Sequence, residues 1–193
     1  HRWSVQILLP PRLLAYWFGN AQGFQNENHW LWRGVLPDKI LPLPWALELS
    51  LLAGIFWPWG RLKLLPRARR TQLALTTLLV LMAISSVKLY SHSSCPWDLQ
   101  MFGGKSAASY VSHWTWGVRD GGSGGCFPAG HASAGFAFGG GFFVFRLVQP
   151  TTAWRWLVGA LLAGLILGMA QQVLGAHYMS HTLWTAWFCW TAA

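Results

Sequence analysis

Long apolar runs that are almost free of charge follow one another along this chain. A helix needs about 20 apolar residues to cross the hydrocarbon layer of a bilayer, so runs of that length bounded by charge, proline or glycine predict membrane spans. Four such runs are clear, and a fifth extends to the last residue: 43–59, 71–90, 131–148, 154–174 and 177–193. Alternating strands of a barrel are not apparent in the pattern, and we therefore expect helices.

An earlier segment, residues 5–18, is apolar but interrupted by Pro10, Pro11 and Arg12. Proline inside a helix removes a backbone hydrogen bond. We therefore expect a short or truncated first span, or a helix that lies in the membrane interface. The pattern as a whole predicts an all-α, polytopic membrane helix bundle of about six spans, forming a single domain over residues 1–193.

The composition agrees with a membrane protein. Of the 193 residues 53% are hydrophobic and only 10% are charged, whereas a soluble domain carries roughly 25% charged residues. The formal net charge is +9, but the basic residues are sorted by loop and do not form the stripe that a nucleic-acid groove requires. We expect no nucleic-acid partner.

The distribution of basic residues predicts the orientation. Short loops rich in Lys and Arg remain in the cytoplasm. The loop between the second and third spans holds five such residues: Arg61, Lys63, Arg67, Arg69 and Arg70. The loop around Arg146 and Arg155 lies on the same side. Residues 91–130 and the turn near Gly175 then face the periplasm or exterior of a bacterial-type inner membrane.

The long external loop, residues 91–130, is rich in glycine and aromatic residues. We expect it to lie on the membrane surface, with a short amphipathic helix near residues 106–116. Cys95 and Cys126 bracket this loop. An exported compartment permits oxidation, and a disulfide between these cysteines would pin the loop.

Candidate chemistry gathers on this external face. Lys88 lies near the end of the third span, Gly130 and His131 lie at the start of the fourth, and His177 begins the last. Helix-start amides and a lysine favour a bound anion. One imidazole could attack phosphorus while the other protonates the leaving oxygen, so these residues predict a phosphate site.

Three motifs stand in order on these spans: Lys88-x6-Cys95-Pro96, Pro128-Ala129-Gly130-His131 and Ala170-Gln171-x5-His177-x3-His181. In order and spacing, residues 71–193 resemble the membrane branch of the type-2 phosphatidic-acid phosphatase superfamily, which also includes the vanadium haloperoxidases. Members carry Lys-x6-Arg-Pro, Pro-Ser-Gly-His and Ser-Arg-x5-His-x3-Asp on the third span, the fourth span and the turn between the fifth and sixth spans.

The resemblance implies a role for each matching position. His177 would be the nucleophile that forms a phosphohistidine, His131 the general acid and Lys88 a phosphate clamp. Further phosphate contacts would come from the matching motif positions Ala129, Gly130 and Gln171, supported by Pro96 and Pro128. The implied substrate is a lipid phosphate monoester or an isoprenoid diphosphate among membrane lipids, with no metal or cofactor. No obligate protein partner is inferred.

Four polar positions depart from the family pattern. The family's arginine, serine, arginine and aspartate are replaced by Cys95, Ala129, Gln171 and His181. Cys and Gln cannot replace the charge and the bidentate fork of a guanidinium, and an imidazole orients a nucleophilic histidine less well than a carboxylate does. Asp98 and Arg119, both in the external loop, are candidates to supply the missing carboxylate and guanidinium.

Several alternatives remain open. The altered pocket could transfer phosphate between two lipids, in the manner of relatives that act on lipid A with undecaprenyl pyrophosphate as donor. A degenerate member could bind a lipid headgroup without turnover. His177, His181 and His131 could instead hold zinc. Finally, Glu48 lies inside the second span, and we expect it to sit near the interface.

Overall fold

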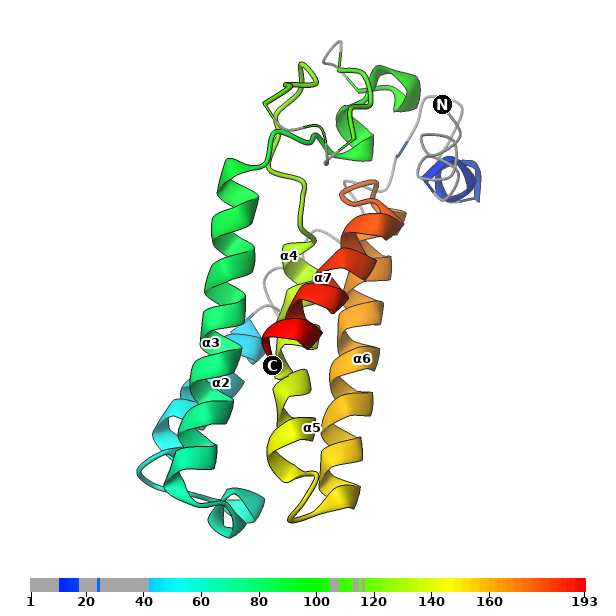
Figure 1. The fold of residues 1–193 in the computed structure, drawn as a ribbon. Helices are drawn as coiled ribbons and strands as arrows, with labels where there is room; N and C mark the ends of the chain where they lie inside the picture. Colours follow the sequence, from blue (N-terminus) through cyan, green and yellow to red (C-terminus); the bar gives the residue numbers. More distant parts are fainter. Residues whose placement is uncertain (1–10, 18–23, 25–41, 105–107, 113–114, 116) are drawn as a thin grey trace.

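The computed structural model describes residues 11–17, 24, 42–104, 108–112, 115 and 117–193 (Figure 1). Its main elements are α2 (Pro42–Gly54), η3 (Gly60–Leu64), α3 (Arg67–Tyr90), α4 (Gly130–Phe136), η6 (Ala137–Gly139), α5 (Gly140–Phe145), α6 (Pro150–Val173) and α7 (Met179–Ala192). Two short 3-10 turns, η4 (Pro96–Asp98) and η5 (Gln100–Phe102), lie in the external loop. Within these described residues only an isolated bridge between Leu99 and Ala108 has strand-like pairing. The all-α prediction is confirmed.

The two longest helices, α3 and α6, start at prolines. Pro66 precedes the first residue of α3, and Pro150 opens α6, where its missing N–H has no intrahelical partner to lose. Among the described residues these two helices are long and apolar enough to cross a membrane. Only 33% and 39% of their most apolar stretches are buried, so most of each stretch could face lipid.

The remaining predicted spans form shorter helices. Residues 131–148 correspond to α4, η6 and α5, which follow one another in one direction with a 3-10 turn between the two α-helices (Figure 1). Gly139 ends this turn and Gly140 and Gly141 begin α5, and glycine is a poor helix former. The expected total of about six spans therefore remains a prediction.

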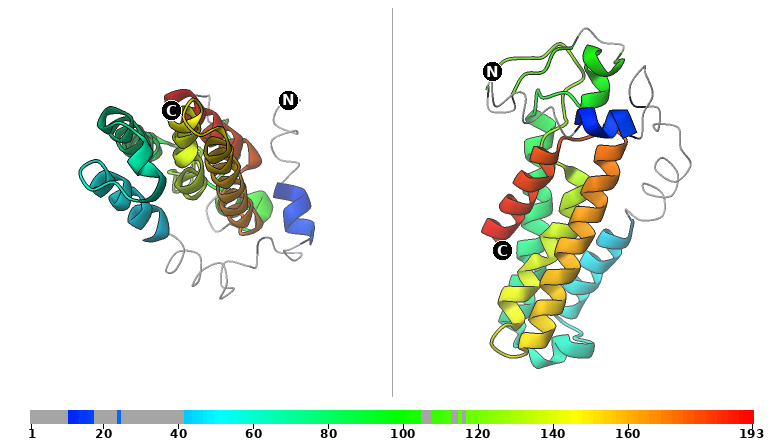
Figure 2. Two further views of the ribbon diagram at one scale, coloured as in Figure 1. Left: turned by 90° about the horizontal axis from the view of Figure 1, so that it is seen from below. Right: turned by 90° about the vertical axis from the view of Figure 1, so that its right-hand side faces the viewer.

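Small residues bring α4 and α6 into backbone contact. A methyl group on Gly135 would overlap the backbone of Gly164, and one on Gly164 would overlap the ring of Phe136. Such small-residue contacts let helices approach closely in a membrane. Helix α7 packs against α4 between α3 and α6, while α2 packs against α3 (Figures 1 and 2).

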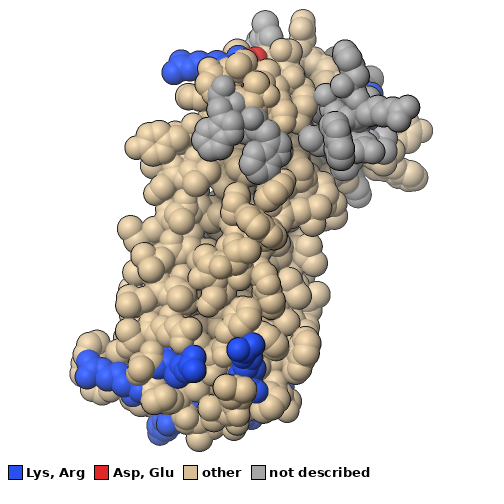
Figure 3. Space-filling model, viewed as in Figure 1, with Lys and Arg blue, Asp and Glu red and all other residues tan. Residues whose placement is uncertain are grey.

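The two ends of the bundle differ in charge. One end contains η3, the start of α3 and the turn between α5 and α6, which carry most of the lysines and arginines among the described residues (Figure 3). A broad uncharged band separates this end from the other, where the external loop covers the ends of α3 and α6 (Figures 1 and 3). We refer to these as the basic end and the loop end.

The helix expected near residues 106–116 is not formed by the described part of that segment. Residues 108–112 and 115 are not helical. The Gln100 N–H donates to the Ala108 carbonyl at 3.1 Å, and the Ser109 N–H donates to the Asp120 carbonyl at 3.2 Å. The prediction is wrong for these residues because their backbone pairs with other parts of the loop; the rest of the segment lies outside the described residues.

Residues 11–17 form a short helix that lies across the bundle axis near the loop end (Figure 2). Ala15 of this helix, together with Phe24, packs against a cluster that includes Leu99, Phe102 and Tyr178. This orientation favours an interfacial helix over a truncated span. The other residues of the expected 5–18 segment lie outside the described part.

Glu48 is buried inside the bundle. Its side chain is 1% exposed, and neither carboxylate oxygen has a hydrogen-bond partner among the described residues. The expectation that it sits near the membrane interface stays a prediction. Helix α2 begins midway along the bundle and runs toward the basic end (Figure 1).

Candidate active site

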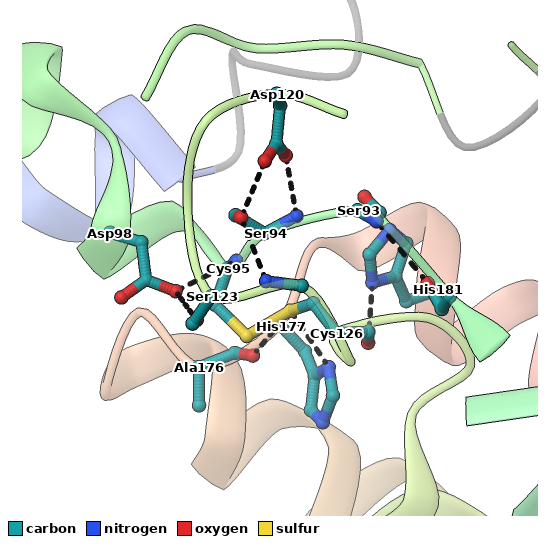
Figure 4. Close-up of a disulfide and its surroundings, with 12 residues drawn as sticks. Ser93, Ser94, Cys95, Asp98, Asp120, Ser123, Cys126, Ala176, His177 and His181 are labelled. Carbon is teal, nitrogen blue, oxygen red and sulfur yellow. Dashed lines mark hydrogen bonds between the residues drawn. A yellow bond between two sulfur atoms is a disulfide. The ribbon is translucent and has the colours of Figure 1, made fainter. Parts of the chain in front are cut away.

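Three segments that are far apart in the sequence meet at the loop end. They are the last turn of α3 with the loop that follows, the start of α4, and the turn that joins α6 to α7 (Figures 1 and 4). Each segment carries one of the three motifs. The structure thus brings Lys88, His131 and His177 to the same end of the bundle.

Lys88 lies against the start of α4. A methyl group on Gly130 would lie 3.8 Å from Lys88 Nζ, which is an ordinary contact distance, so the ammonium group and the start of α4 are neighbours. The positive charge of Lys88 acts on both His131 and His177. Lys88 is itself half-buried, which strengthens such interactions because water screens them less.

His177 is held in a neutral form by its surroundings. Burial, followed by the nearby charges of Lys88 and His131, lowers the pKa of His177 to about 3, and a hydrogen bond with the Cys126 backbone partly opposes this shift. Its Nδ1 lies 3.5 Å from Cys126 Sγ, and its other ring nitrogen is turned away from the disulfide (Figure 4). At neutral pH the imidazole therefore carries no charge and keeps a lone pair.

Cys95 and Cys126 form a disulfide at the centre of the site (Figure 4). The Cys126 N–H donates to the Ser93 carbonyl at 2.9 Å, and Cys126 Sγ lies 3.0 Å from the Ala176 carbonyl oxygen. The bridge thus holds the segment after α3, the segment before α4 and the turn before His177 in contact.

His181 contacts the same cysteine from the opposite side. Its Nδ1 lies 3.1 Å from the Cys126 carbonyl oxygen. Its ring packs against Phe127 and Tyr178, with ring centroids 5.1 and 4.8 Å away. His181 therefore fixes the backbone of the residue that lies beside His177.

The backbone amide of Ala129 is already bonded within the protein. It donates to Thr185 Oγ1 at 2.9 Å, and the Thr185 hydroxyl donates to the His181 carbonyl at 2.7 Å. The Ala129 amide is therefore occupied within the protein and the methyl side chain has no donor, and the phosphate contact expected at this position stays a prediction. Thr185 was not predicted from the sequence, although its position four residues after His181 places it on the same face of α7.

Gln171, Pro96 and Pro128 have structural positions. The Gln171 carbonyl accepts a hydrogen bond from the Ala176 N–H at 2.9 Å, and the residue is buried. It therefore shapes the turn that leads to His177. Both prolines are fully buried, and Pro96 opens the η4 turn directly after Cys95.

Two aspartates organise the loop around the disulfide. Asp98 Oδ2 accepts hydrogen bonds from the Cys95 N–H at 3.3 Å and the Ser123 hydroxyl at 2.9 Å. Figure 4 shows its carboxylate turned toward these groups, on the far side of the disulfide from the His177 ring. In this arrangement Asp98 orders the loop, and its proposed role as the missing carboxylate partner remains a hypothesis.

Asp120 was not predicted from the sequence. Its carboxylate accepts hydrogen bonds from the Ser94 N–H at 2.6 Å, the Ser94 hydroxyl at 2.7 Å and the Gly122 N–H at 3.0 Å. The Asp-Gly-Gly sequence at 120–122 is a turn signal that could have identified it. Asp120 thus joins the two halves of the loop through Ser94, the residue before Cys95.

A polar cavity of about 590 Å³ opens beside Lys88. Arg119 lines it from the loop, together with the glycine-rich residues 122–125. The two histidines of the phosphate motif do not belong to its lining. Lys88 is therefore the link between this cavity and the histidines, and Arg119 is a second cation within the same cavity.

A metal site is not supported by the donor geometry. Among the described residues one group of potential ligands lies close enough to hold an ion, namely Cys95, Cys126 and His177. Metal binding requires thiolates, whereas both cysteines are in the disulfide. The alternative zinc site of His131, His177 and His181 does not form such a group.

Comparison with known proteins identifies one family. The family model described as the PAP2 superfamily matches residues 69–193. This range begins near the start of α3 and includes all three motifs. Comparisons with curated proteins and with solved structures gave no match.

Proposed function

The chain belongs to the PAP2 superfamily, and from this premise we propose that it is a membrane-embedded lipid phosphatase whose site lies at the loop end. The superfamily supports phosphatase-type activity on phosphate esters. The single observation that carries the proposal for this chain is the convergence of the three motif segments around a buried His177 that lies against Cys126 (Figure 1).

His177 acts as the nucleophile in this proposal. Cys126 occupies its Nδ1 side, which leaves Nε2 to attack phosphorus. The P–N bond forms as the P–O bond to the lipid breaks, and protonated His131 gives its proton to the leaving oxygen. Water then attacks the phosphohistidine with His131 as base, releasing phosphate and restoring both histidines.

Two features stand in for parts of the family motif. Lys88 and Arg119 line one cavity, so Arg119 is our candidate for the guanidinium that Cys95 and Gln171 do not supply. Cys126 lies against Nδ1 of His177, the side on which a carboxylate would otherwise orient an imidazole. His181 then acts indirectly, by fixing the Cys126 backbone.

The substrate would be a lipid phosphate monoester or an isoprenoid diphosphate that enters from the membrane. An apolar cleft of about 610 Å³ lies near the loop end between α3 and α7, lined among others by Tyr90, Phe127, Trp184, Trp187 and Phe188. Such a cleft suits a hydrocarbon chain. The basic end faces the cytoplasm by the positive-inside rule, so the site would face the periplasm.

The test is a panel of lipid phosphates and diphosphates in detergent, with free phosphate and lipid-transferred phosphate measured together. We expect release to fall at least about 1000-fold in His177→Ala and in His177→Asn, because both variants lack Nε2. Asn retains a polar atom on the Cys126 side and serves as the folding control. Equal release by wild type and His177→Asn would overturn the proposal.

The same panel separates the alternatives. Transfer of phosphate to a second lipid without free phosphate would indicate a phosphotransferase. Retention of lipid phosphates by the wild type, with neither release nor transfer, would indicate a lipid-headgroup binder. The headgroup binder is tested because both family arginines are replaced by uncharged residues, Cys95 and Gln171.

A further inference from the structure

An apolar groove starts at the basic end and runs along α6 as far as Leu167. It has a volume of about 550 Å³ and lies between α2 and α6, with α4 and η6 forming its floor. Its walls are almost entirely apolar and include Leu47, Phe138, Trp156 and Leu167. None of the residues assigned to phosphate chemistry lines it.

The groove has the length of one membrane leaflet. Along α6 its lining runs from Thr152 to Leu167, and the apolar part of this lining, from Trp156 to Leu167, is about 17 Å long at roughly 1.5 Å per residue. The hydrocarbon core of a bilayer is about 30 Å thick. A single acyl chain of the leaflet at the basic end could therefore lie in the groove without reaching the loop end.

Two arginines close the groove at the basic end. Arg61 of η3 and Arg155 of α6 line both the groove and an adjoining polar cavity of about 320 Å³. The Arg61 guanidinium donates to Gln149 Oε1, which also accepts from the Thr152 hydroxyl at 2.9 Å. This arrangement holds Arg61 at the mouth of the groove.

The charge of this mouth is not balanced by the described residues. The acidic residues among them are Asp98 and Asp120, both in the loop at the opposite end, and Glu48, which is buried in α2. Figure 3 shows basic residues at this end of the molecule without acidic ones on the visible face. An anion from outside the described chain would therefore complement the two guanidinium groups.

We propose that this groove binds an anionic phospholipid of the leaflet at the basic end, with one acyl chain between α2 and α6 and the headgroup phosphate between Arg61 and Arg155. The shape and the charge of the groove both fit this lipid, because the apolar groove has about the length of one leaflet and ends at two cationic side chains. The site is independent of the proposed phosphatase function, since it uses other residues at the other end of the bundle.

The test measures which lipids remain bound to the protein, and it does not depend on phosphatase activity. The full chain is equilibrated in detergent with equal amounts of phosphatidylglycerol and phosphatidylcholine, and the lipids that remain bound are identified by native mass spectrometry. Each basic residue near an anionic lipid favours binding about five-fold, so we expect wild type to prefer phosphatidylglycerol by about 30-fold. The Arg61→Gln/Arg155→Gln variant should lose this preference.

Matched variants separate this site from general charge attraction. Lys63→Gln/Arg69→Gln removes the same charge at the same end, outside the groove, and should keep the preference. The Cβ position of Gly159 faces open space in the groove, so Gly159→Phe should fill it and reduce retention of both lipids at least about 10-fold, while Gly159→Ala should not.

Two results would overturn the proposal. One is an undiminished preference for phosphatidylglycerol in Arg61→Gln/Arg155→Gln, or a loss no greater than in the Lys63→Gln/Arg69→Gln control. The other is wild-type lipid retention by Gly159→Phe, which would show that another part of this chain or nothing at all occupies the groove. The Gly159→Phe measurement tests the proposal even if the Arg61→Gln/Arg155→Gln variant fails to fold.

Discussion

The disulfide between Cys95 and Cys126 should contribute strongly to the stability of the loop end. It closes a loop with a sequence separation of 31 residues. In the chain-entropy description, closing a loop of that length disfavours the unfolded chain by about 3.7 kcal/mol at 25 °C. For a chain of this size, a loss of that magnitude corresponds to a fall of about 7–15 °C in Tm.

Single and double alanine variants of the two cysteines, followed by tryptophan fluorescence during thermal unfolding in detergent, measure this contribution. Because either substitution alone breaks the bridge, we expect both single variants and the double variant to show the same fall in Tm. The control is Cys189→Ala, which removes a buried thiol that is not in a disulfide and should cost only about 1 kcal/mol.

Phosphate release provides a second measurement. Cys126 lies between His177 and His181, so breaking the bridge should reduce release more than Cys189→Ala does, when both are assayed below their Tm. Additive losses in the double variant, or a fall in Tm no larger than that of the control, would refute the view that the bridge holds the site together.

Three further predictions concern charge and packing. The pKa of His177 is lowered to about 3 in the folded protein and is about 6.5 in an unfolded chain, so the unfolded state binds more protons between these pH values. Stability measured by denaturant unfolding should therefore fall as the pH is lowered from about 6.5 toward 3. The His177→Asn variant should show a flatter pH dependence. Glu48→Gln should raise the free energy of unfolding by about 1–3 kcal/mol, because the buried carboxylate has no hydrogen-bond partner among the described residues; a loss of stability would reveal a partner. Gly135→Ala should lower Tm, because its methyl group would overlap the Gly164 backbone at a cost of about 1–3 kcal/mol, whereas Gly159→Ala on the same helix pair should leave Tm unchanged or raise it.

Much of the fold could be predicted from the sequence because hydrophobicity is a local property. The runs at 71–90 and 154–174 correspond closely to α3 and α6, and lipid requires each such segment to satisfy its own backbone hydrogen bonds. The structure of the external loop was harder to predict, because its backbone can form hydrogen bonds with water or with neighbouring segments. There the expected helix near 106–116 is replaced over its described residues by pairing with Leu99, Gln100 and Asp120.

The candidate site was predictable in part for a similar reason. Order and spacing along helices of known direction suffice to expect Lys88, His131 and His177 at one end. The sequence by itself thus determined the helical class, the sorting of charge and the family motifs, since each depends on neighbours along the chain. Only the tertiary structure decided that Cys126 lies against His177, that the Ala129 amide donates to Thr185, and that two arginines line one end of an apolar groove. These contacts join residues distant in sequence, and their geometry follows from how the helices pack.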